Sequence, residues 1–86
     1  MIKIGYKTSF VRQFDVLEEN LQVEVLEKIE LFKNPQNHRQ LKVHKLHGEL
    51  KNSYSFSVNY KIRIVFEYLS KDEVALLTIG DHKIYQ

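Results

Sequence analysis

The chain has 86 residues, which is room for one domain, residues 1–86, around one hydrophobic core. Hydrophobic residues make up 43% of it and charged residues 28%, a balance typical of a folded globular protein and not of a disordered chain. The absence of cysteine excludes disulfides and thiolate metal sites, and the apolar runs are too short for a membrane span or a signal peptide. We therefore expect a cytoplasmic protein.

The net charge of +2 is unevenly distributed. Residues 1–38 carry five Lys/Arg and six Asp/Glu (−1), residues 39–71 carry seven and two (+5), and residues 72–86 carry one and three (−2). Clustered cations attract phosphate groups, so the basic segment 39–71 is a candidate nucleic-acid surface. The same charges would also suit a solvated sheet face with lysines along its edges.

The first 38 residues predict one strand followed by two helices. Residues 2–6 alternate like a strand, and Ser9 is a plausible N-cap for a helix whose apolar residues recur at helical spacing. Asn20 can cap a second helix, whose apolar stripe is formed by Leu21, Val25, Ile29 and Phe32. Asn34-Pro35 ends that helix because proline lacks the N–H donor. The two segments form an antiparallel helical pair or one bent helix.

The remaining residues predict four strands. These are 41–47, 54–58, 62–69 and the nearly all-apolar 74–79, which should lie centrally. The order β-α-α-β-β-β-β predicts an α+β fold, in which a helical hairpin packs on one face of a small antiparallel sheet. The alternation places Ser55, Ser57 and Arg63 together on the other face, which we expect to be open to solvent.

Three short motifs accompany this order of elements: Lys45-Leu46-x-Gly48, the strand Arg63-Ile64-Val65-Phe66, and the ending Ile79-Gly80-Asp81-His82-Lys83-Ile84-Tyr85. With them, essentially the whole chain resembles the RelE/ParE toxin superfamily, most nearly the RelE- and YafQ-like mRNA interferases. The resemblance implies a RelE-like fold and a toxin of a type II toxin–antitoxin system, neutralised by a cognate antitoxin in a hetero-oligomer. It also implies an endoribonuclease that cleaves mRNA on the ribosome by attack of the ribose 2′-OH, with neither metal nor cofactor.

The resemblance implies site residues one by one. Arg63 falls where RelE-like toxins place an arginine that helps to bind the scissile phosphate, and His82 falls where YafQ-like toxins use a histidine. Tyr85 matches the aromatic residue near the C-terminus, and His44 matches a histidine of YafQ-like toxins. RNA-binding contacts are expected from neighbouring basic and hydroxyl side chains: Lys45, Lys51, Lys61, Ser55, Ser57 and Lys83.

The residue types suit metal-free RNA cleavage, which needs a base, a proton donor and cations at the phosphate. Histidine can transfer protons near neutral pH, so His82 is the first candidate and His44 the second. The planar fork of Arg63 suits a phosphate, and Tyr85 could stack on a base or polarise the 2′-OH. The ordinary alternatives are surface histidines, a salt bridge from Arg63 to Glu67, and a C-terminal tyrosine that packs on the core.

Departures from the family pattern keep two other functions open. Ser55 and Ser57 stand where RelE carries two lysines, Lys61-Ile62 replaces an Asp-Trp pair of the YafQ branch, and Thr78 replaces its arginine. One alternative is a ParE-like, non-catalytic toxin that inhibits DNA gyrase. The other is an inactive homologue that still binds an antitoxin.

Overall fold

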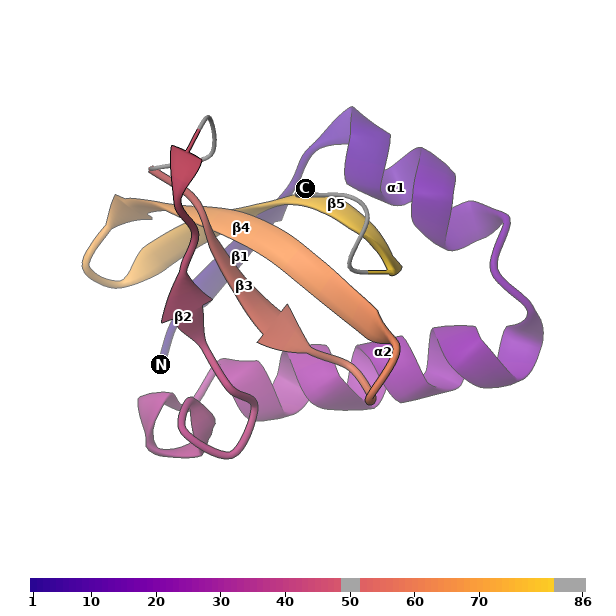
Figure 1. The fold of residues 1–86 in the computed structure, drawn as a ribbon, viewed down its shortest axis with the longest axis horizontal. Helices are drawn as coiled ribbons and strands as arrows, with labels where there is room; N and C mark the ends of the chain where they lie inside the picture. Colours follow the sequence, from indigo (N-terminus) through magenta and orange to yellow (C-terminus); the bar gives the residue numbers. More distant parts are fainter. Residues whose placement is uncertain (49–51, 82–86) are drawn as a thin grey trace.

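The computed structural model describes residues 1–48 and 52–81. These form two α-helices, a short 3-10 helix (η1) and five strands, in the order that the sequence predicts (Figure 1). The elements are β1 (Lys3–Tyr6), α1 (Thr8–Asp15), α2 (Glu19–Phe32), η1 (Pro35–Asn37), β2 (His44–Lys45), β3 (Tyr54–Ser57), β4 (Ile62–Ser70) and β5 (Glu73–Asp81). None of the helices in these two stretches is long and apolar enough to cross a membrane. The α+β fold is confirmed.

The five strands form one mixed sheet in the order β1-β5-β4-β3-β2. Strands β2, β3, β4 and β5 each pair antiparallel with the next strand along the chain, whereas β1 runs parallel to β5 with Lys3 opposite Glu73. The expectation of a purely antiparallel sheet is therefore wrong at β1. Both helices lie between β1 and the later strands in sequence, and such a helical crossover allows two strands to run in the same direction. The apolar strand 74–79 does lie inside the sheet, between β1 and β4.

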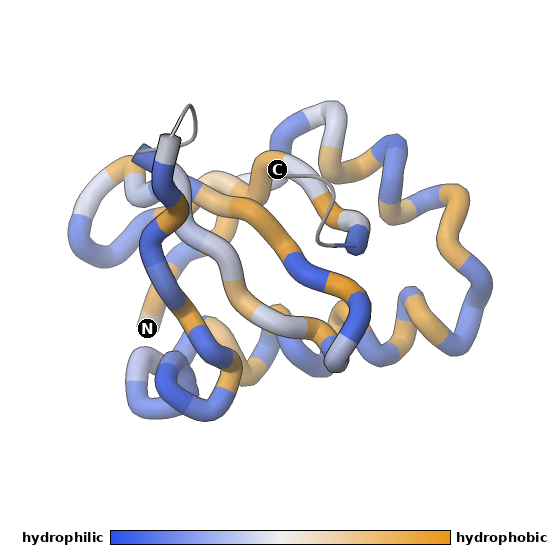
Figure 2. Tube along the Cα trace, in the orientation of Figure 1, coloured by the Kyte–Doolittle hydropathy of each residue, from blue (hydrophilic) through white to orange (hydrophobic). Residues whose placement is uncertain are grey.

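One face of the sheet and the apolar stripe of α2 enclose the main core. The buried stripe residues Val25, Ile29 and Phe32 recur at the 3.6-residue period of a helix, and Figure 2 shows this alternation of hydropathy along α2. The ring of Phe32 stacks on Phe56 of β3 with 4.3 Å between centroids and meets Phe66 of β4 edge-on at 4.8 Å. Side-chain packing across these rings fixes α2 against the sheet.

The helix starts differ from the prediction. Helix α1 begins at Thr8 with Lys7 as its N-cap, and the hydroxyl of Ser9 instead donates to the Leu77 carbonyl of β5 at 2.6 Å. Helix α2 begins at Glu19, after the N-cap Glu18 and not after an Asn20 cap. Three residues outside both helices separate them, so the segment forms a helical pair and not one bent helix. The sequence predicts a local hydrogen bond for Ser9 because it cannot show that β5 passes beside α1.

The predicted strand 41–47 is shortened to two residues. Lys42 has a φ of +58°, a left-handed backbone conformation that interrupts an extended strand. The chain therefore turns after the buried Leu41, whose carbonyl accepts from the Ser57 N–H at 2.8 Å, and β2 begins at His44. Residues 42–43 thus change the direction of the backbone beside the end of β3.

The second face of the sheet is not open at its centre. Ser55 is 0% exposed, and Val65 and Ala75 on the same face are 3% and 4% exposed. The cross-strand register places Ser55 beside Val65, and Val65 beside Thr78. The prediction that Ser55 faces solvent is wrong, because alternation shows only the side on which a residue lies and not whether that side is covered.

Candidate functional site

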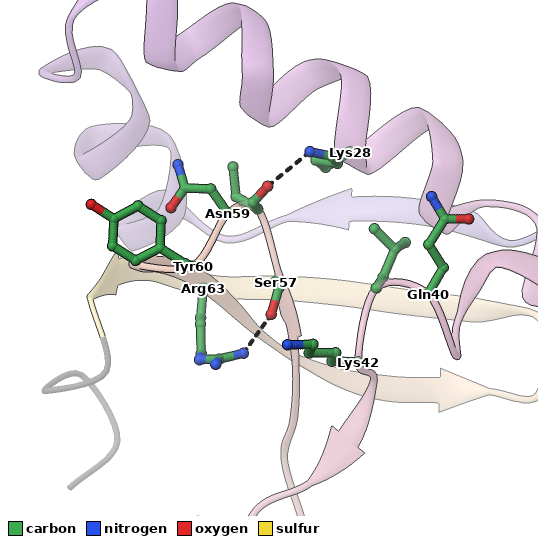
Figure 3. A pocket seen from close by; sticks show the side chains of 9 residues that line it. Lys28, Gln40, Lys42, Ser57, Asn59, Tyr60 and Arg63 are labelled. Atoms are coloured by element: carbon green, nitrogen blue, oxygen red, sulfur yellow. Dashed lines mark hydrogen bonds between the residues drawn. The ribbon is translucent and has the colours of Figure 1, made fainter.

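Arg63 and Ser57 form the centre of the candidate site. They are opposite each other in the β3–β4 register, and Arg63 Nη1 donates to Ser57 Oγ at 2.5 Å (Figure 3). Cross-strand partners share one face of a sheet, which brings the two side chains together. The only salt bridge found within residues 1–48 and 52–81 joins Lys33 to Glu30, so the alternative ion pair between Arg63 and Glu67 does not form there.

A pocket of about 370 Å³ opens beside this pair (Figure 3). It lies between α2, the segment before β2, the end of β3, the β3–β4 turn and the start of β4. Among the described residues its lining includes three cations and no carboxylate: Lys28, Gln40, Leu41, Lys42, Ser57, Val58, Asn59, Tyr60 and Arg63. A concave surface lined by cations alone concentrates anions, because low-dielectric walls focus the field of the charges.

Two of the pocket's cations are positioned by the backbone of neighbouring elements. The half-buried Lys28 reaches from α2 and donates from Nζ to the Val58 carbonyl at 2.9 Å. Lys42 stands at the left-handed turn before β2. Together with Arg63 they approach one pocket from a helix, a turn and a strand (Figure 3).

The β3–β4 turn is shaped by Asn59. Its Oδ1 accepts from the N–H groups of Lys61 and Ile62 at 2.9 and 2.8 Å, and its Nδ2 donates to Glu24 Oε1 of α2 at 2.7 Å. Such a side-chain turn satisfies the backbone donors locally. It leaves the Tyr60 side chain 96% exposed at the rim of the pocket.

His44 lies on β2, across β3 from Arg63. Its Nδ1 is 2.9 Å from the Lys42 carbonyl and its Nε2 is 3.5 Å from Ser55 Oγ. A carbonyl only accepts, so Nδ1 carries the proton in the neutral ring and the lone pair of Nε2 faces the Ser55 hydroxyl. His44 pairs with Ser55, and Arg63 pairs with the next residue on the same face, Ser57. Strand spacings then give roughly 12 Å between the Cα atoms of His44 and Arg63.

The other expected site residues are dispersed. Lys45 is exposed on β2 opposite Tyr54, so it points to the other face from His44. Lys61 is exposed in the β3–β4 turn and does not line the pocket. Ser55 is buried beneath His44 and has no free surface for direct RNA contact. Four further expected residues lie outside the described residues: His82, Tyr85, Lys51 and Lys83.

Five pocket residues are not predicted from the sequence as site residues: Lys28, Gln40, Lys42, Asn59 and Tyr60. A signal for Lys28 was present, because it lies three residues after Val25 and four before Phe32, on the apolar side of α2. A lysine at such a position is either covered along its stem or directed toward a polar gap. The turn residues carried no comparable signal. Within the described stretches no group of three or more His, Asp and Glu side chains is placed to hold a metal ion.

Neither a protein-family model nor a curated protein matches this sequence. Solved structures do. The solution structure of the conserved hypothetical protein HP0894 from Helicobacter pylori aligns at 26% identity with a TM-score of 0.73, over 96% of this chain and 97% of that one. A copper-bound mutant toxin from Helicobacter pylori aligns at 25% identity with a TM-score of 0.68, over the full length of both chains. A chain of the toxin–antitoxin complex RelBE2 from Mycobacterium tuberculosis aligns at 16% identity with a TM-score of 0.71, over 94% and 98%.

Proposed function

Because the chain has the fold of the RelE-like toxin superfamily, we propose that it is the toxin of a type II toxin–antitoxin pair and an endoribonuclease that cleaves mRNA on the ribosome. A cognate antitoxin would neutralise it in a hetero-oligomer in the cytoplasm. The alternative readings, a gyrase inhibitor and an inactive homologue, lead to different results in the experiment described below.

The observation that carries the proposal is the basic pocket at Arg63. Of the described residues, three cations and no carboxylate line it, and the guanidinium of Arg63 is already oriented by Ser57. A guanidinium fixed in place before the reaction stabilises the charge that develops on a phosphate in the transition state, often as the largest single contribution to catalysis. Arginine also offers two parallel hydrogen bonds to a phosphate. The pocket is therefore suited to a phosphodiester.

In the proposed reaction the ribose 2′-OH attacks the adjacent phosphorus. A base removes the 2′-OH proton, the bond from phosphorus to the 5′-oxygen breaks, and an acid returns a proton to that oxygen. The products are a 2′,3′-cyclic phosphate and a 5′-hydroxyl. Arg63 would stabilise the pentacoordinate phosphate. His82 and His44 are the proposed proton-transfer residues. Of the two, His44 lies among the described residues, and its Nε2 would carry the lone pair that accepts a proton. Tyr85 is proposed to stack on a base.

The small size of the protein favours a substrate that another particle holds. Its principal extents are 31 × 28 × 24 Å, and its basic pocket has the volume of a small-ligand site. Holding the reacting groups in line supplies much of the rate enhancement in such reactions. A ribosome that presents single-stranded mRNA would supply this positioning.

A cell-free translation extract tests the proposal. Purified protein is added during translation of a defined message, and the message is analysed by primer extension, with untranslated message as the control for ribosome dependence. Cleavage confined to translated message supports the proposed function. Intact message together with loss of gyrase supercoiling activity would instead establish the gyrase inhibitor. Intact message, normal supercoiling and no growth arrest on expression without a partner would establish the inactive homologue.

A further inference from the structure

The pocket holds three features that the cleavage step does not use: the ammonium groups of Lys28 and Lys42, and the exposed ring of Tyr60. We propose that they form a second nucleotide subsite, in which Lys28 and Lys42 each bind a separate phosphate beside the scissile one and Tyr60 stacks on a base. This inference rests on the proposed function, since it extends the same RNA site. The proposed ligand is single-stranded RNA. The subsite would bind it through charge and base stacking and not through hydrogen bonds to the edges of the bases.

Lys28 is placed for a ligand and not only for packing. Its stem lies on the apolar side of α2, half-buried, and its ammonium reaches the pocket at the Val58 carbonyl. An ammonium group has three donors, and this bond uses one of them. No carboxylate from residues 1–48 or 52–81 lines the pocket to neutralise it. A phosphate oxygen would supply both the missing acceptor and the missing charge.

Lys42 has the second unusual feature. It is the only described non-glycine residue with a positive φ, at +58°. Lysine gains nothing from that conformation, which Gly and Asn adopt more readily. Backbone strain of this kind is concentrated at functional sites, where the surrounding structure maintains it. Here the strained turn directs the carbonyl of Lys42 to His44 and places its side chain along the pocket.

Tyr60 supplies a surface for a base. It is 96% exposed in a turn that Asn59 fixes through two backbone N–H groups, so the aromatic ring stands on a rigid support beside the cations. Exposed aromatic rings next to basic grooves are the usual stacking platforms of proteins that bind single-stranded nucleic acid. The pocket volume of about 370 Å³ suits one nucleotide and excludes a duplex.

Binding of a short RNA that cannot be cleaved tests the subsite apart from catalysis. The probe is a fluorescein-labelled heptaribonucleotide with 2′-O-methyl riboses, which lack the attacking hydroxyl, and its Kd is measured by anisotropy over a salt series. Each phosphate contact contributes about 0.7 to the slope of log K against log salt for single strands. We expect Lys28→Met and Lys42→Asn each to reduce the slope by about that amount. Tyr60→Ser should weaken binding about tenfold and leave the slope unchanged.

Matched variants separate binding from folding. Lys71→Met removes an exposed lysine from the β4–β5 turn and should leave both Kd and slope at the wild-type values. Lys42→Gly relieves the strained backbone, so we expect a higher Tm together with weaker RNA binding, whereas Lys42→Asn keeps a residue that tolerates the conformation. A lysine variant that binds RNA with the wild-type Kd and slope while it remains folded would overturn the subsite.

The outcomes also distinguish this inference from the proposed function. If wild-type protein cleaves translated message but the three pocket variants cleave and bind like Lys71→Met, the subsite is wrong and the nuclease stands. If the variants lose RNA binding as described but the wild type cleaves no message, the subsite stands and the nuclease is wrong. If an oligo-glutamate peptide binds more tightly than the RNA with the same dependence on Lys28 and Lys42, an acidic protein segment occupies the pocket and the RNA subsite is overturned.

Discussion

The guanidinium of Arg63 is oriented by Ser57, whose Oγ accepts a hydrogen bond at 2.5 Å across the β3–β4 pair. The bond crosses the two strands where both border the basic pocket. The hydrogen bond therefore holds the guanidinium in one orientation at the pocket. This relationship gives the first prediction.

Ser57→Ala should slow mRNA cleavage about tenfold, because Arg63 keeps its charge but loses the group that fixes its orientation. Arg63→Lys should slow it by about a hundredfold, since a point charge cannot reproduce the fork. Single-turnover cleavage in a translating extract measures both rates. Ser70→Ala, at the exposed far end of β4, is the matched control and should cleave at the wild-type rate. Wild-type rates for Arg63→Lys would remove the arginine from the mechanism.

His44→Asn should lower the cleavage rate by about a hundredfold or more if His44 transfers a proton. The asparagine amide can still donate to the Lys42 carbonyl, as Nδ1 does, so the fold around β2 is preserved while the base is lost. His47→Asn changes a second exposed histidine of the same segment and serves as the control. Equal cleavage by His44→Asn and wild type, at equal Tm, would assign proton transfer to other groups.

Thr78→Val should stabilise the protein. The Thr78 hydroxyl is buried beside Val65 and has no hydrogen-bond partner among the described residues. A buried unsatisfied hydroxyl is costly, and valine has nearly the same shape, so we expect a gain of about 1 kcal/mol in the free energy of unfolding. Urea denaturation of the two proteins measures the difference. A loss of stability in Thr78→Val would mean that the hydroxyl is bonded after all.

Tyr68 gives a prediction about alkaline pH. Partial burial raises the pKa of Tyr68 above its ordinary value of 10.0, and the Tyr54 phenol, 5.1 Å away between ring centroids, adds to the rise. The folded state thus holds the proton more tightly than the unfolded chain. The resulting stabilisation is complete below the unfolded pKa and is lost as the pH rises through the folded pKa.

Between about pH 9 and pH 11, wild type should therefore lose stability faster than Tyr68→Phe, which has no phenol to ionise. Urea midpoints across this range give the comparison. The difference in phenolate absorbance between the two proteins gives the titration of Tyr68 itself. A midpoint at or below 10 in that difference would contradict the structural account of its surroundings.

Periodicity predicted the parts of the fold in which one face is apolar. The apolar residues that recur along α2 and alternate along β4 are the ones that the structure buries, among them Val25, Ile29, Ile64 and Phe66. It could not reveal the partner of β1, because four residues contain no information about the strand beside them. It also could not show that Ser55 is covered, since coverage of a second face depends on chain segments remote in sequence.

The candidate site was predicted only in its strand residues. Arg63 and Ser57 share a face because side chains alternate along strands, and this alternation predicts that they lie together. The pocket, however, is completed by Lys28 from α2 and by Lys42 from a turn with a left-handed backbone. No local pattern brings residues 28, 42 and 63 together; only the packing of α2 across the end of β3 does so.

The most direct test of the nuclease account is the cleavage of one translated message by wild type, Arg63→Ala and Arg12→Ala. Arg12 is an exposed arginine of α1 and matches the change in charge. The account predicts cuts with 2′,3′-cyclic phosphate ends for wild type and Arg12→Ala, and a loss of at least about a hundredfold for Arg63→Ala. Equal cutting by Arg63→Ala, or an intact message with wild type, would contradict it.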